Sequence, residues 1–141
     1  MESYTYKFTT PKSREEIFEL LLDVRQWWSG FYGETFEGKS QQLNDEFTFS
    51  AGDGMHSSKQ RLVEITPNEK IVWLVTQSNL SFLNDPHEWE NSKIMFVLET
   101  VSNKTTITFT HQGLEPHVEC YGACTNAWGQ YLGNLKKTLN E

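Results

Sequence analysis

The sequence predicts an α+β domain in which a curved antiparallel sheet packs against a long C-terminal helix. Three observations predict this class: a helical pattern near the N-terminus, a long central region with an apolar period of two, and a final segment with apolar steps of three and four. A chain of 141 residues is long enough to bury one sizeable core. We therefore expect residues 1–141 to form a single domain.

The N-terminal region is predicted to contain a strand followed by two short helices. Residues 3–10, SYTYKFTT, alternate between aromatic and polar side chains, as a half-buried strand does. In the next segment, TPKSREEIFELLLD, Ser13 and Glu16 have the spacing of a capping box, which predicts the start of a helix. The segment VRQWWSG then predicts a second short helix that ends at Gly30.

The region from residue 31 to residue 111 is predicted to form five or six antiparallel strands, because its apolar residues follow a period of two. Residues 78–91 interrupt this pattern with an irregular connection that contains Pro86 and two isolated aromatic residues. The clearest strand segments are DEFTFSAG (45–52), HSSKQRLVEI (56–65), IVWLVTQ (71–77), SKIMFVLETV (92–101) and TTITFTH (105–111).

The last predicted element is a helix of about 22 residues that begins at Pro116, which corresponds to about 33 Å. Its apolar residues are Tyr121, Cys124, Trp128, Leu132, Leu135 and Leu139. Gly122, Gly129 and Gly133 weaken a helix by about 1 kcal/mol each relative to Ala. Glycine at these positions suggests that the helix passes close to the sheet or to a ligand.

Charge and composition exclude several classes of function. The net charge is −7 and the basic residues are scattered, so we expect no binding to nucleic acid or to an anionic membrane surface. The chain shows no signal-peptide pattern and no apolar run of about 20 residues. Two cysteines four positions apart do not make a secreted disulfide scaffold. We therefore expect a cytoplasmic location.

Taken in order, four segments resemble the START-like superfamily, also called the polyketide cyclase (SRPBCC) or helix-grip superfamily. The chain is most similar to the branch named after the activator of heat-shock-protein ATPase. The resemblance implies the helix-grip fold over nearly the full length, but no single function, because the superfamily contains carriers, cyclases, hydrolases and co-chaperones. The segments are FTTPKSREEIFELLLDVRQWWSG (8–30), KQRLVEITPNEKIVWLV (59–75), TITFTHQGL (106–114) and NAWGQYLGNLKKTL (126–139).

The segment HQGLEPHVECYGACTNAW, residues 111–128, contains four side chains that could bind zinc: His111, His117, Cys120 and Cys124. We expect them to be structural, because Cys124 falls on the apolar face of the predicted helix and His111 on the inward side of its strand. We expect no metal and no cofactor. A Cys120–Cys124 disulfide is not expected, since helical side chains at that spacing do not suit the required torsion. No flanking signature supports a cysteine nucleophile.

The aromatic residues give the strongest indication of function, since they make up 13% of the chain. Rings on the sheet and on the last helix can enclose an apolar ligand, with a few polar groups to orient it. A core filled by its own side chains is the alternative. The residues that we expect to contact a ligand are Trp28, His56, Trp73, Phe96, Phe109, His111, Tyr121, Cys124, Trp128 and Tyr131.

We therefore expect the protein to bind a small hydrophobic or aromatic molecule rather than to catalyse a reaction. One alternative is a cyclase or hydrolase that uses His56, His111 or Tyr131 as an acid or base. Glu88 and Glu90 form a further pair of carboxylates, although solvated loop charges are the simpler interpretation. Another alternative, implied by the resemblance, is a module that interacts with a chaperone ATPase. An exposed apolar patch would favour that role or a homodimer.

Overall fold

The computed structural model describes residues 3–140 and contains a seven-stranded antiparallel sheet with the strand order β1-β7-β6-β5-β4-β3-β2. Three helices accompany the sheet. The elements in chain order are β1 (Tyr4–Thr10), α1 (Arg14–Leu22), α2 (Val24–Trp27), β2 (Thr35–Gly38), β3 (Glu46–Ala51), β4 (His56–Thr66), β5 (Lys70–Leu80), β6 (Lys93–Val101), β7 (Lys104–Gln112) and α3 (Tyr121–Leu139).

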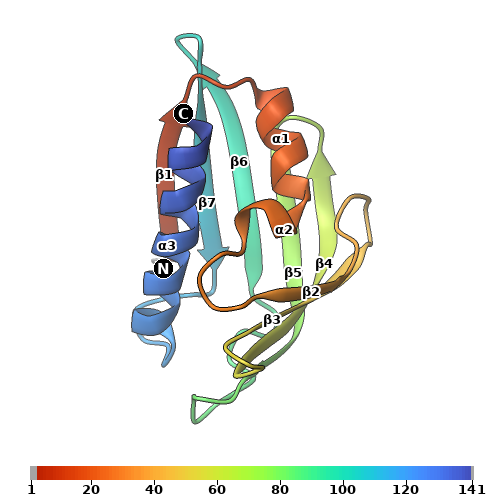
Figure 1. Ribbon diagram of the computed structural model, residues 1–141, viewed down its shortest axis with the longest axis vertical. Helices are drawn as coiled ribbons and strands as arrows, with labels where there is room; N and C mark the ends of the chain where they lie inside the picture. Colours follow the sequence, from red (N-terminus) through yellow and green to blue (C-terminus); the bar gives the residue numbers. More distant parts are fainter. Residues whose placement is uncertain (1–2, 141) are drawn as a thin grey trace.

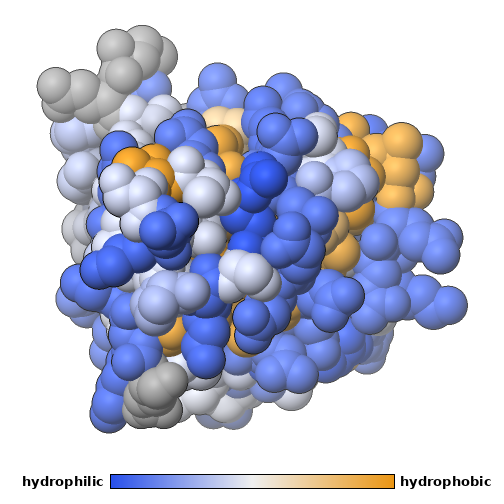
Figure 2. All heavy atoms as spheres, turned by 90° about the horizontal axis from the view of Figure 1, so that it is seen from above, coloured by the Kyte–Doolittle hydropathy of each residue, from blue (hydrophilic) through white to orange (hydrophobic). Residues whose placement is uncertain are grey.

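All three helices lie on the same face of the sheet, with α3 in front of β1 and β7 and with α1 and α2 in front of the central strands (Figure 1). The hydrophobic core lies between these two layers. At the end of the molecule shown in Figure 2, the surface is mainly hydrophilic with small, separate hydrophobic patches. The predicted α+β helix-grip arrangement is confirmed. Sequence reasoning did not identify β2 separately, because its segment TFEG is four residues long and contains one apolar side chain.

The sheet is curved and opens between β5 and β6. Two register shifts in the pairing of β4 with β5 bend the sheet, as β-bulges do. Strands β5 and β6 pair only from Lys70 to Leu74. Beyond that point the connection 81–92 returns to the sheet, where Val75 N–H donates to the Ser92 carbonyl (2.9 Å). This path places Trp89, which is 3% exposed, against the core.

The N-terminal helices form where their local sequence predicts, but α2 ends at Trp27 rather than at Gly30. The Ser13 hydroxyl accepts a hydrogen bond from the Glu16 N–H (3.2 Å), so Ser13 caps α1 as predicted. The Glu16 carboxylate accepts from the Ser13 hydroxyl (3.2 Å) and not from the Ser13 N–H, so the reciprocal bond of a full capping box is replaced. Helix α2 is a single turn that directs Trp27 and Trp28 into the core, where the two rings stack. The Trp27 indole N–H donates to the Leu21 carbonyl (2.8 Å), which ties α2 to α1.

Helix α3 begins at Tyr121 rather than at Pro116, so its predicted start was wrong by five residues. The Glu88 carboxylate accepts hydrogen bonds from the N–H groups of Glu119 (2.7 Å) and Cys120 (2.9 Å). The connection 81–92 thus caps the N-terminus of α3, where a negative charge is favourable. The buried residues of the helix are Cys124, Trp128, Tyr131, Leu132, Leu135 and Leu139.

The interpretation of the three helical glycines as points of close approach was wrong. A methyl group placed on Gly122, Gly129 or Gly133 would have no atom outside the local helix backbone within 4 Å. Neither the sheet nor the cavity therefore requires glycine at these positions.

Cys120 and Cys124 form a disulfide, and the expectation that their geometry would prevent it was wrong. The prediction placed both residues inside a helix, whereas Cys120 is the N-cap residue and only Cys124 lies within α3. Their Cα atoms are 5.4 Å apart, which is within the range that a disulfide can bridge. The disulfide therefore links the first turn of α3 to the residue that precedes it.

We expect iodoacetamide to modify neither cysteine of the folded or urea-unfolded protein until a reductant is added, because both thiols are consumed in the disulfide. Intact-mass spectrometry after alkylation with and without dithiothreitol checks this. Two carbamidomethyl groups are expected only in the reduced sample. Modification of unreduced, unfolded protein would show that the pair is present as free thiols.

Candidate functional site

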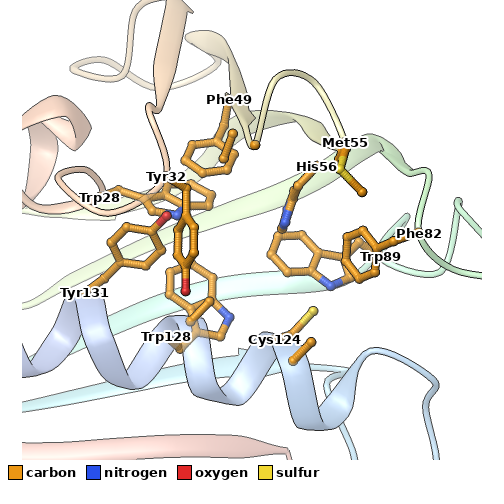
Figure 3. Close-up of a pocket in the computed structure, with 14 residues that line it drawn as sticks. Trp28, Tyr32, Phe49, Met55, His56, Phe82, Trp89, Cys124, Trp128 and Tyr131 are labelled. Carbon is orange, nitrogen blue, oxygen red and sulfur yellow. The ribbon is translucent and has the colours of Figure 1, made fainter.

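A cavity of about 250 Å³ lies between the first half of α3, the end of β3, the start of β4, the loop after α2 and the connection 81–92. Its wall is mainly aromatic and aliphatic, and side chains from α3, from the loop after α2 and from the connection 81–92 face one another across it (Figure 3). The residues that line it are Trp28, Tyr32, Phe49, Ala51, Gly52, Met55, His56, Phe82, Trp89, Ala123, Cys124, Ala127, Trp128 and Tyr131.

The structure brings half of the predicted ligand-contacting residues to this cavity. Those in its wall are Trp28, His56, Cys124, Trp128 and Tyr131. Those outside it are Trp73, Phe96, Phe109 and His111, which are buried in the core, and Tyr121, which is half-buried at the start of α3. Alternation along a strand predicts which side chains face the helices. It does not predict which of these side chains are covered by neighbouring rings and so kept out of the cavity wall.

Sequence reasoning missed several residues of the cavity wall. Trp89 and Phe82 come from the irregular connection, Met55 from the turn before β4, and Tyr32 from the loop after α2. The only sequence signal for Trp89 and Phe82 was their isolation as large aromatic side chains in an otherwise polar segment. Loop residues carry no periodicity, so their direction follows from the path of the folded chain.

Trp128 is at the centre of the aromatic cluster that forms the floor of the cavity. Its ring centroid lies 4.7 Å from that of Phe109 and 5.1 Å from that of Trp28, and its ring stacks at 6.0 Å on Trp89. The side chain is 2% exposed. Trp128 therefore separates the cavity from the core beneath it.

His111 is held in one tautomer beneath Trp128. Its Nδ1 accepts a hydrogen bond from the Trp128 indole N–H (3.1 Å), so the ring proton is on Nε2, which lies 2.9 Å from the Ser92 hydroxyl. That hydroxyl in turn donates to the Trp89 carbonyl (2.6 Å). Burial, together with the nearby His56, lowers the pKa of His111 to about 3. His111 is therefore neutral at pH 7, with both nitrogens hydrogen-bonded.

The loop of residues 28–34 is fastened to α3 and forms one side of the cavity. The Glu34 carboxylate accepts hydrogen bonds from the N–H groups of Gly30 (2.9 Å) and Tyr32 (3.0 Å) and from the Tyr131 hydroxyl (2.6 Å). The Tyr32 hydroxyl donates to the side chain of Gln130. These contacts explain how a loop without regular structure keeps its aromatic residues at the cavity.

The Glu34–Tyr131 contact also changes the acidity of both groups. Burial alone would raise the pKa of Glu34, but the hydrogen bonds from Tyr131 and from the loop N–H groups outweigh it, so its pKa is lowered. Burial and the bond to the Glu34 carboxylate raise the pKa of Tyr131. Tyr131 therefore keeps its proton, which it donates to Glu34.

His56 is the first residue of β4 and lies at the other end of the cavity from Tyr131 (Figure 3). Its ring packs edge-to-face against Phe49, with centroids 5.4 Å apart, and against Trp89, with centroids 4.6 Å apart. Burial lowers the pKa of His56 to about 4. The imidazole is therefore uncharged at neutral pH.

The carboxylates of the connection 81–92 have structural contacts. Glu88 caps α3, and Glu90 accepts a hydrogen bond from the Ser78 N–H (3.2 Å). Within residues 3–140, no three His, Cys, Asp or Glu side chains are grouped so that they could hold a metal ion. None of the helices formed by these residues has the length and hydrophobicity that a bilayer-spanning helix requires.

Comparison with known proteins identifies a family and several proteins of the same fold. Residues 11–140 match the family described as Activator of Hsp90 ATPase homolog 1-like protein. The solution structure of the Aha1 dimer from Colwellia psychrerythraea has a TM-score of 0.74 and 22% identity, with 99% of this chain and 97% of that chain covered. Among curated proteins, no sequence matches this chain.

Two further solved structures are similar. The major latex-like protein 151 of Panax ginseng has a TM-score of 0.69 and 11% identity, with 98% of this chain and 97% of that chain covered. DynU16, a putative protein in the dynemicin biosynthetic locus, has a TM-score of 0.67 and 13% identity, with 99% of this chain but 47% of that chain covered. At these identities the likeness shows the fold alone. Together with the family match, it confirms the predicted resemblance to the START-like superfamily near the ATPase-activator branch.

Proposed function

This chain belongs to the Activator of Hsp90 ATPase homolog 1-like family, and we propose that it binds a small hydrophobic or aromatic molecule in the cavity between its sheet and α3. The observation that carries this proposal is a cavity of about 250 Å³ that the surrounding aromatic side chains leave unfilled. An apolar cavity of about 150 Å³ already holds a benzene molecule in another protein. The volume here suits a ligand of two or three aromatic rings.

Binding accounts for the site better than acid–base catalysis does. A general acid or base needs a nitrogen or oxygen that can exchange a proton with the substrate. Both nitrogens of His111 are hydrogen-bonded, and the Tyr131 hydroxyl donates to Glu34. His56 is the remaining candidate among the three predicted residues, and burial makes it a weak base at neutral pH. A cyclase-like reaction, which the family and fold also suggest, would therefore depend on His56.

A second candidate function is interaction with a protein partner, either a chaperone ATPase or a second copy of this chain. The family description and the dimeric state of the Colwellia psychrerythraea structure favour it. Four large apolar side chains near the cavity opening are 41–52% exposed: Phe31, Tyr32, Met55 and Phe82. Sedimentation of the purified chain, alone and with the ATPase, separates these two partners.

The ligand-binding proposal is tested with N-phenyl-1-naphthylamine, an uncharged aromatic dye whose fluorescence rises in apolar surroundings. We expect a saturable, one-site increase in fluorescence. The variant Ala127→Phe is expected to weaken this binding by about tenfold, because Ala127 lines the cavity and a larger side chain would fill it.

Asn126→Phe is the matched control, because Asn126 is exposed on the same helix and does not line the cavity. This variant is expected to bind the dye as the wild type does. The absence of saturable binding to the wild type would contradict the proposal. Equal weakening by the two substitutions would place the dye elsewhere on the protein.

A further inference from the structure

Two buried nitrogens in the cavity wall have no hydrogen-bond partner in the described part of the chain: His56 Nε2 and Trp89 Nε1. Leaving a buried polar group unpaired is unfavourable, and most such groups in folded proteins are paired. Both nitrogens belong to residues that line the same cavity. Both atoms are buried beneath the surface of the cavity, so a bound molecule that supplies the missing partner has to turn these rings toward itself.

Three other buried tryptophans pair their indole N–H groups within the protein. Trp27 donates to the Leu21 carbonyl (2.8 Å), and Trp73 donates to the Ser40 hydroxyl (2.8 Å). Trp128, beneath the cavity, donates to His111 (3.1 Å). The indole of Trp89, which lines the cavity, differs from these three in having no partner within residues 3–140.

His56 and Trp89 form one end of the cavity. Their rings are nearly perpendicular, with an interplanar angle of 86° and centroids 4.6 Å apart, and the imidazole points toward Trp89 (Figure 3). At the opposite end, the polar groups are already paired, since the Tyr131 hydroxyl donates to Glu34 and the Tyr32 hydroxyl to Gln130. Among residues 3–140, the buried polar side-chain atoms of the cavity wall that lack a partner are thus those of His56 and Trp89.

Building on the ligand-binding function proposed above, we propose that the ligand is an uncharged aromatic hydroxyl compound, with its rings between Trp28, Phe49 and Trp128 and its hydroxyl group at His56 and Trp89. An indole N–H only donates, so the ligand atom there must accept. A hydroxyl oxygen accepts from Trp89, and the same group can donate to His56 or accept from it. A hydroxyl is therefore compatible with either tautomer of the imidazole.

The charges around the cavity explain why the ligand is uncharged. Burial lowers the pKa of His56 to about 4, so no positive charge at this end would balance a carboxylate at neutral pH. The Glu34 carboxylate is at the other end of the cavity and holds the Tyr131 hydroxyl. The net charge of −7 also disfavours anionic molecules.

Equilibrium dialysis with three bicyclic probes at pH 7.5 tests this inference: 2-naphthol, naphthalene and 2-naphthoate. We expect 2-naphthol to bind about tenfold more tightly than naphthalene, because only 2-naphthol pairs the orphaned nitrogens. We expect 2-naphthoate to bind at least about tenfold more weakly than 2-naphthol, because its charge would be buried without a partner.

The variants Trp89→Phe and His56→Leu each remove one of the two nitrogens. In each variant the preference for 2-naphthol over naphthalene is expected to fall to about threefold or less, while naphthalene binding changes little. Trp27→Phe is the control for Trp89, because it also removes an indole N–H from the core but does not line the cavity. It should retain the full preference.

The possible failures of the two proposals are distinguishable. If naphthalene and 2-naphthol bind the wild type equally well, the cavity binds aromatic molecules but the hydroxyl site is wrong. A preference that survives in both Trp89→Phe and His56→Leu would also overturn the hydroxyl site. If none of the three probes binds and N-phenyl-1-naphthylamine also fails, the ligand-binding function itself is wrong.

Discussion

Replacing Trp128 with Ala is expected to lower the free energy of unfolding by about 3–5 kcal/mol, the usual cost of truncating a buried tryptophan. Trp128 is 2% exposed and contacts Trp28, Trp89 and Phe109. Its removal would join the cavity to the core and leave these rings without their common neighbour. Urea unfolding at pH 7.5, followed by circular dichroism, measures the change.

Trp128→Phe separates the loss of packing from the loss of a hydrogen bond. Phe keeps a ring in the core but leaves Nδ1 of His111 without its donor, so we expect a loss of about 1–3 kcal/mol from the orphaned acceptor in addition to the smaller ring. Phe31→Ala is the control, because Phe31 is 42% exposed and its loss should change stability by about 0.5 kcal/mol or less. A Trp128→Ala variant as stable as Phe31→Ala would contradict the central position of Trp128.

Acidification from pH 7 to pH 5 is expected to reduce the free energy of unfolding by about 2 kcal/mol through His111 alone. The unfolded chain binds a proton at this residue near its ordinary value of 6.5, whereas burial holds the folded pKa at about 3. Below pH 6.5 the unfolded state therefore binds more protons, and stability is lost as the pH falls toward the folded value. His56, with a folded pKa of about 4, adds a loss of the same sign.

In the variant His111→Gln, the change in the free energy of unfolding between pH 7 and pH 5 is expected to be smaller by about 2 kcal/mol, because an amide does not titrate. The Gln amide can still accept a hydrogen bond from Trp128 and donate one to Ser92. Urea titrations at the two pH values give the difference for each protein, so any uniform destabilisation by the substitution cancels. The lowered pKa of Glu34 affects the free energy of unfolding mainly below pH 4.5, the ordinary pKa of a glutamate, and therefore outside the range from pH 5 to pH 7. An unchanged difference in the variant would show that His111 binds its proton equally in both states.

The arrangement of elements followed from short-range patterns in the sequence. The capping-box spacing of Ser13 and Glu16 marks the start of α1, and alternation along β3 to β7 predicts the strands. The apolar steps of three and four predict α3, although not its first residue. Each of these signals depends on residues within a few positions of one another, where the helix or strand period imposes the pattern.

The disulfide and the path of the connection 81–92 could not be predicted in the same way. Whether Cys120 can pair with Cys124 depends on Cys120 lying at the helix boundary, and Glu88 caps that boundary from another segment. Trp89 enters the cavity because β5 and β6 separate after five paired residues. The cap by Glu88 and the separation of β5 from β6 involve segments that are distant in the sequence, and neither leaves a periodic pattern.

The sequence by itself determined that an antiparallel sheet packs against a long amphipathic helix, and that aromatic residues line the space between them. Only the tertiary structure decided which rings fill the core and which line the cavity. Trp73 and Trp128 are both buried aromatic residues on inward faces, yet only Trp128 borders the cavity. Trp73 is surrounded by the rings of Trp27, Phe47 and Phe96, which come from other elements of the fold, whereas one side of Trp128 is left facing the cavity.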